Sequence, residues 1–113
     1  MINGKMRAMY FLAGGFGLFI FSISAGMTQA AAPHTGETEF KLYCSACHAD
    51  GGNIINPAKT LSKADREKNG IKTAADIIKL MRNPGAGMSQ FDEKTLPEKD
   101  AEKIAEYILK TFR

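Results

Sequence analysis

The order of hydrophobic and polar positions divides the chain into an apolar start and a series of short amphipathic segments. From residue 36 onward, apolar side chains recur at spacings of three and four, the period of a helix that buries one face. No useful stretch has the two-residue alternation of a β-strand, so the pattern predicts an all-α fold. The clearest apolar stripe contains Ala101, Ile104, Ala105, Ile108, Leu109 and Phe112.

Polar pairs mark where the predicted helices begin. A Thr or Ser followed three residues later by an acidic residue has the spacing of a capping box. The pairs are Ser62 with Asp65, Thr73 with Asp76, and Thr95 with Glu98. The last of them has Pro97 in what would be the first helical turn. A further helix follows Thr35, and loops rich in Gly, Pro and Asn separate the segments.

The first thirty residues have the layout of a secretory signal peptide. Lys5 and Arg7 precede an apolar run over residues 8–27, and the small-residue stretch "TQAAA" follows it. We expect cleavage after Ala30, to within about two residues, which leaves 31–113 as a domain in the periplasm. The alternative is an uncleaved anchor, because the run approaches the roughly 20 residues that span a bilayer.

The charge balance changes sharply when the first segment is set aside. The chain has 15 Lys and Arg and 12 Asp and Glu, and only Lys5 and Arg7 lie before residue 31, which leaves a formal charge of +1 for 31–113. A nearly neutral domain has no basis for strong counterion-driven binding of nucleic acid. A domain this short is also marginal without a disulfide, metal or cofactor to complete its core.

The only cysteines, Cys44 and Cys47, lie in the motif "CSACH" with His48 directly after the second. A redox dithiol of the thioredoxin type needs a βαβ setting that this chain lacks. A structural zinc site needs four ligands, and His34, near the start of the domain, is the one further candidate of the usual Cys or His type. The third interpretation, one covalently attached haem c with His48 bound to its iron, agrees with both the spacing and the export signal.

A second axial ligand would decide the chemistry of such an iron. Only Met81 and Met88 remain after residue 30. Met81 shares a predicted helix face with Ile77, as core methionines do, whereas Met88 lies in a glycine-rich loop followed by Phe91, which we expect to pack in the haem pocket. With His48 and Met88 both bound, the iron would exchange single electrons. If Met88 stays off the iron, the protein would instead bind a diatomic gas or reduce peroxide.

Four stretches, "CSACH", "GGNIINPAKTL", "GAGMSQF" and "IAEYILKTF", resemble the class I monohaem cytochromes c. The resemblance is to the soluble type that replaces plastocyanin and, more closely, to relatives in metal-reducing bacteria. It implies four to five short helices around one haem, with the first and last helices crossing so that Gly36 and Phe40 pack against Tyr107. It also implies that the Pro57 carbonyl accepts the proton of His48. Photosynthetic members usually have proline after the ligand methionine, where this chain has Ser89.

The expected function is therefore that of a periplasmic electron carrier rather than an enzyme. We expect a monomer that is not embedded in the membrane and contacts other redox proteins transiently, although a fixed subunit of a larger complex would have the same sequence features. His34 is expected to be a solvated residue of the tail. A solvated surface rather than a docking site is expected for the basic cluster Lys59, Lys63, Arg66, Lys68 and Lys72.

Overall fold

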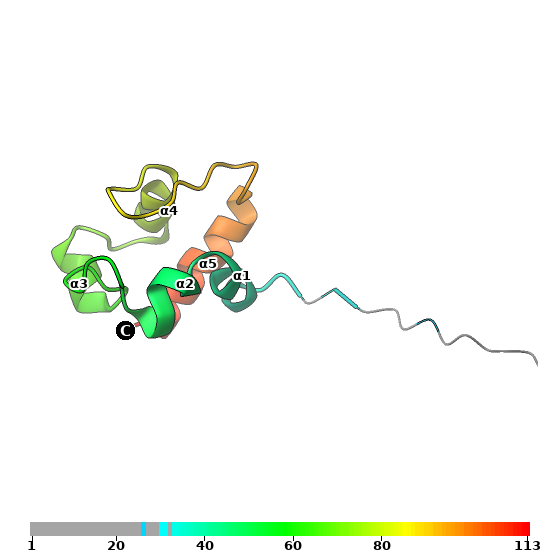
Figure 1. Ribbon diagram of the computed structural model, residues 1–113, viewed down its shortest axis with the longest axis horizontal. Coiled ribbons are helices and arrows are strands. Elements are labelled where there is room, and N and C mark those ends of the chain that lie inside the picture. Colours follow the sequence, from blue (N-terminus) through cyan, green and yellow to red (C-terminus); the bar gives the residue numbers. More distant parts are fainter. Residues whose placement is uncertain (1–25, 27–29, 32) are drawn as a thin grey trace, which may run out of the picture.

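The computed structural model describes residues 26, 30, 31 and 33–113, and in them it contains five α-helices, one 3-10 turn and no strand (Figure 1). The elements are α1 (Gly36–Tyr43), α2 (Ser45–His48), the 3-10 turn η1 (Ala49–Gly51), α3 (Lys63–Lys68), α4 (Ala74–Arg82) and α5 (Glu98–Thr111). The all-α prediction is confirmed. The signal-peptide prediction concerns residues that lie almost wholly outside the described part of the chain.

The helix starts follow the polar pairs, with one exception. Thr73 caps α4 by accepting from the backbone N–H of Asp76, whose side chain bonds back to the cap residue. The predicted cap of α5 at Thr95 is wrong, because α5 begins after Pro97 without a side-chain cap. The backbone N–H of Thr95 instead donates to Oδ1 of Asp92 at 2.7 Å. Asp92, three residues before the expected cap, therefore forms a separate turn that includes Thr95.

Helix α5 is the centre of the core, and α1 and α4 both pack against it. Four members of its predicted stripe, Ala101, Ile104, Ala105 and Ile108, are buried, and the other two, Leu109 and Phe112, are partly buried against this core. The crossing with α1 is close: the Phe40 and Tyr107 ring centroids are 5.3 Å apart. A Cβ atom added at Gly36 would overlap the carbonyl oxygen of Lys103, so the two backbones touch where the helices cross.

Arg66 departs from the prediction of a solvated basic cluster. The four lysines of that cluster are exposed, but Arg66 is only 6% exposed. Its Nε donates to the Leu61 carbonyl oxygen at 2.8 Å and its Nη2 donates to the Phe112 carbonyl oxygen at 3.1 Å. The guanidinium therefore joins α3 to the end of α5, which lies near the C-terminus in Figure 1.

None of the helices in the described ranges combines the length and apolar character needed to cross a bilayer.

Candidate functional site

One cavity brings together the residues of both ligand motifs. It has a volume of about 340 Å³, which is in the roughly 300–1,000 Å³ range of cofactor and ligand pockets. Cys44, Cys47 and His48 line it from the α1–α2 region, and Met88 and Phe91 line it from the loop after α4. These two segments are about forty residues apart in the sequence. The fold therefore unites the five predicted side chains at a single site.

The imidazole of His48 is held by the backbone just beyond it. Its Nδ1 lies 2.7 Å from the carbonyl oxygen of Gly52. Since a carbonyl can only accept, Nδ1 carries the proton and Nε2 keeps the lone pair that could bind a metal. The expected partner, the Pro57 carbonyl, is not the acceptor, and exposed Pro57 does not line the cavity. The tight turn at Asp50, with φ of 52°, returns the chain so that Gly52 takes this place.

The two cysteines are half-buried free thiols in the wall of the cavity. Burial raises the pKa of the Cys44 thiol to about 11. A redox-active dithiol depends on a lowered thiol pKa, so the environment of Cys44 is opposite to the one that such chemistry needs. A structural zinc site gains no support either, because His34 does not line this cavity.

Met88 is half-buried and packs against the hydrophobic core, in a loop held at both sides. Its backbone N–H points to the Gly85 carbonyl oxygen at 3.5 Å. The backbone N–H of Phe91 donates to the Met81 carbonyl oxygen at 3.0 Å, and the Phe91 ring meets Tyr43 edge-on at 6.0 Å between centroids. Met81 is in the core, as predicted, with 3% of its surface exposed.

Arg82, at the end of α4, anchors this loop. This role was not predicted from the sequence. Its Nη1 donates to the carbonyl oxygens of Phe91 and Leu96, each at 2.9 Å, and its Nη2 pairs with Glu98 at 2.8 Å. Gln90 completes the connection by donating to the Arg82 carbonyl oxygen at 2.8 Å. The one signal in the sequence is a basic residue in the last turn of a helix, which is too common to identify an anchor.

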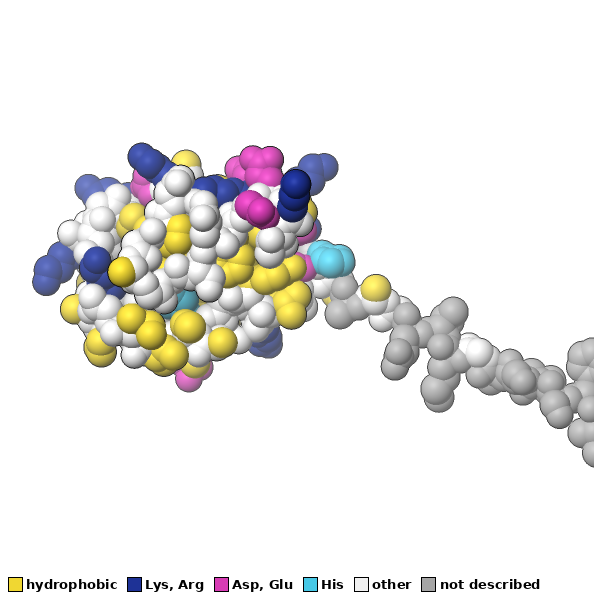
Figure 2. Space-filling view, turned by 45° about the horizontal axis from the view of Figure 1, so that its top comes forward, with side chains coloured by type: hydrophobic (Ala, Val, Ile, Leu, Met, Phe, Trp, Pro, Cys, Tyr) yellow, Lys and Arg dark blue, Asp and Glu magenta, His cyan; other side chains and the backbone are white. Residues whose placement is uncertain are grey.

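The residues present fit a covalently attached haem. Two thiols three positions apart, an imidazole with a free Nε2 and a thioether share a cavity whose other walls are largely apolar. The apolar surface extends onto the rim, where Ile55 is 59% and Leu80 is 38% exposed. Figure 2 shows hydrophobic side chains gathered on one face of the helical body, with Lys and Arg around them. The helical fold of the described residues and this donor set together define a small c-type cytochrome.

Comparison with known proteins identifies the family. The family described as "Cytochrome C oxidase, cbb3-type, subunit III" matches residues 31–108. The cytochrome c6 of Rippkaea orientalis is 38% identical over 105 residues, covering 93% of this chain and 91% of that protein. The cytochrome c6 of a Nostoc species is 38% identical over 95 residues and covers 84% of each chain.

Solved structures of similar fold also belong to small cytochromes. The outer membrane cytochrome F (OmcF) of Geobacter sulfurreducens superposes with a TM-score of 0.67 at 46% identity, over 69% of this chain and 99% of that one. Cytochrome c6C of a Synechococcus species gives a TM-score of 0.64 at 28% identity, over 68% of this chain and 93% of that one. The chain belongs to the class I monohaem cytochromes c. It binds one covalent haem c with its iron and is an electron-transfer protein, not an enzyme.

Proposed function

We propose that residues 31–113 form a periplasmic single-electron carrier with His/Met ligation. In this proposal Cys44 and Cys47 hold the haem as thioethers, and His48 and Met88 are the axial ligands. The observation that carries the proposal is that one cavity is lined by all four side chains although they come from two distant segments. Met81, the other methionine of the domain, also lines the cavity, but it is only 3% exposed and packed within the core, whereas Met88 is half-buried in the loop.

Each side chain has a defined task in this carrier. The bound haem iron supplies the gain and loss of one electron, and thioether ligation favours its reduced state. The Gly52 carbonyl accepts from the Nδ1–H of His48, which holds the ring and leaves Nε2 of this cavity-lining residue available for the iron. The mainly apolar lining keeps water from the site. With His48 and Met88 both bound to the iron, no ligand position would remain for oxygen or peroxide.

The rim supports transient contacts with redox partners. Ile55 and Lys59 of the same loop line the cavity; Ile55 is 59% exposed, and its neighbour Ile54 is 67% exposed. Small contacts of under roughly 1,200 Å² are typical of electron-transfer encounters. We expect a monomer whose contacts weaken as ionic strength rises, because exposed charges are screened within about 10 Å at 0.1 M salt.

A matched pair of methionine variants tests the ligation. Met88→Leu and Met81→Leu each remove one thioether and approximately conserve volume, so neither should unfold the protein. We expect Met88→Leu to abolish the weak red band of ferric iron–thioether ligation and to allow rapid binding of carbon monoxide after reduction. Met81→Leu should keep the band and the resistance to carbon monoxide. A band that survives in Met88→Leu, or rapid carbon monoxide binding by the unaltered protein, would favour the five-coordinate alternative or another ligand.

Export is tested separately. We expect the haem-containing protein to be recovered from the periplasmic fraction with an N-terminus within about two residues of Ala31. Recovery from the membrane fraction with residues 1–30 still attached would instead establish the anchored form.

A further inference from the structure

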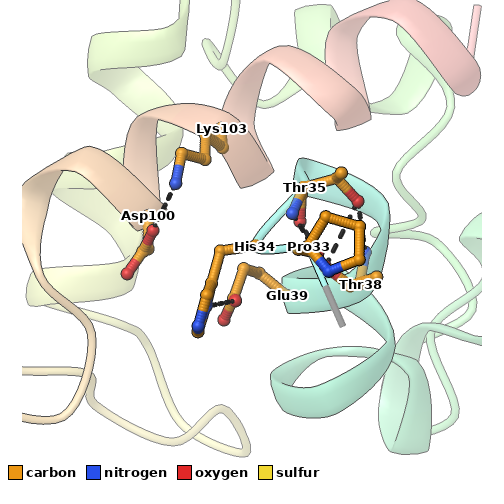
Figure 3. A network of polar contacts seen from close by, with 7 residues as sticks. All are labelled: Pro33, His34, Thr35, Thr38, Glu39, Asp100 and Lys103. Atoms are coloured by element: carbon orange, nitrogen blue, oxygen red, sulfur yellow. Dashed lines mark hydrogen bonds and ion pairs between the residues drawn. The ribbon is translucent and has the colours of Figure 1, made fainter. Parts of the chain in front are cut away.

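A second group of ligand-type side chains lies away from the haem cavity. His34 precedes α1, Glu39 lies in α1, and Asp100 lies in the first turn of α5 (Figure 3). One ligand atom from each residue lies within 4.8 Å of the other two. None of the three residues lines the haem cavity. The group joins the segment before the first helix to the start of the last one.

Glu39 is an unusual member of this group because its carboxylate is buried. The residue is only 6% exposed, whereas most other acidic residues in the described part of the chain are exposed. Among the described residues, the one hydrogen-bond partner recorded for this carboxylate is Nδ1 of His34, at 2.6 Å. A buried carboxylate requires a partner of opposite charge or a metal ion. The His34 ring, 71% exposed, is a partner of opposite charge only when it is protonated.

We propose that His34, Glu39 and Asp100 form a binding site for a divalent cation of the zinc class. One imidazole nitrogen and two carboxylate oxygens are ligands that Zn²⁺ accepts, with water in the fourth position. Three atoms no more than 4.8 Å apart always have a point within about 2.8 Å of each. Side-chain movements of under about 1 Å would then bring all three to the roughly 2.0–2.2 Å of zinc ligands.

Without a bound divalent cation, the three ligand side chains already have other partners. Nζ of Lys103 pairs with Oδ1 of Asp100 at 2.8 Å, and a proton bridges His34 and Glu39 (Figure 3). A cation that binds here must displace both. Lys103 is the basic side chain that pairs with this group among the described residues, so with neutral His34 the group has a formal charge of −1. This charge favours a divalent cation, and Lys103 weakens the attraction.

The test is calorimetric titration of the haem-loaded protein with Zn²⁺ in a non-chelating buffer. Haem loading consumes the thiols of the other site, so they do not compete. We expect one saturable site, weakened at least about tenfold in His34→Ala and in Asp100→Asn. Lys103→Gln should bind Zn²⁺ at least about threefold more tightly, because it removes the competing cation. Glu102→Gln, which changes an exposed charge in the same helix, is the matched control and should leave the affinity unchanged.

The pH dependence adds an independent readout. Zn²⁺ competes with protons for the ligand atoms of the site, so its affinity should fall as the pH is lowered. His34→Ala should lose this dependence. Absence of saturable binding at millimolar Zn²⁺ would overturn the proposal. Binding that is equally tight in His34→Ala and Asp100→Asn would also overturn it, as would weaker binding in Lys103→Gln.

Discussion

The guanidinium of Arg82 should control both the stability of the fold and the placement of Met88. It is 16% exposed and donates to two carbonyl oxygens, those of Phe91 and Leu96, in the loop that contains Met88. Arg82→Met keeps most of the side-chain volume and removes every donor. The two carbonyl groups then lose their partner in a region where Leu96 is only 1% exposed.

The expected loss follows from these contacts. Leaving a buried acceptor unsatisfied costs about 1–3 kcal/mol, and two are affected. The ion pair with Glu98, whose side chain is 52% exposed, adds only about 0–1 kcal/mol. Because neighbouring contacts are not additive, we expect the free energy of unfolding to fall by about 2–5 kcal/mol. This is a large share of the roughly 5–15 kcal/mol of an ordinary domain.

Denaturant unfolding of the haem-loaded protein measures this loss. Circular dichroism reports the helices, and the weak red band of ferric iron–thioether ligation reports Met88. In Arg82→Met we expect the red band to disappear at a lower denaturant concentration than the helical signal, because the loop loosens first. The control is Glu98→Gln, which removes only the exposed ion pair and should cost no more than about 1 kcal/mol. Equal losses in the two variants would refute the assignment of Arg82 as the anchor of the loop.

Two further variants test other parts of the fold. Gly36→Ala should lower the free energy of unfolding by about 1–3 kcal/mol in denaturant titration, because its Cβ meets the backbone of Lys103, which cannot rotate away; an unchanged midpoint would contradict the close crossing. The carboxylate of Asp76 accepts from the backbone N–H groups of Lys72 and Thr73, which lowers its pKa. Its stabilising effect is therefore present above the unfolded pKa of about 3.9 and lost as pH falls below it. Asp76→Asn should make stability less dependent on pH in this acid range, and an unchanged acid slope would contradict the role.

The features that the sequence predicts well depend on neighbours along the chain. The cap at Thr73 requires only a residue three positions away, and the buried stripe of α5 requires only the helical period. "CSACH" predicts haem attachment for the same reason, because all the residues of the motif lie within five positions of the sequence. Local rules fail where two of them compete, as at Thr95, whose backbone N–H donates to Asp92 rather than to Glu98 as a capping box would require.

The features that the sequence does not predict depend on contacts between distant segments or on a single backbone angle. Arg66 bonds to a carbonyl group 46 residues away, and nothing near it in the sequence distinguishes it from the exposed lysines around it. The acceptor for His48 is Gly52 rather than Pro57 because Asp50 adopts a positive φ. Asp and Asn tolerate that conformation better than most residues, but the sequence does not show where they use it.

Arg66 and Arg82 both provide hydrogen-bond donors to backbone carbonyl groups outside regular secondary structure. Two long segments beside the cavity, residues 52–62 and 83–97, contain no helix, so their backbone polar groups must find partners outside secondary structure. Each arginine donates to two carbonyl oxygens at once, which the planar five-donor guanidinium allows and a single ammonium group does less well. The loops can therefore form walls of the cavity without strands. Because Arg82 sits between the core and the segment of Met88, satisfying the backbone and positioning the proposed ligand depend on the same side chain.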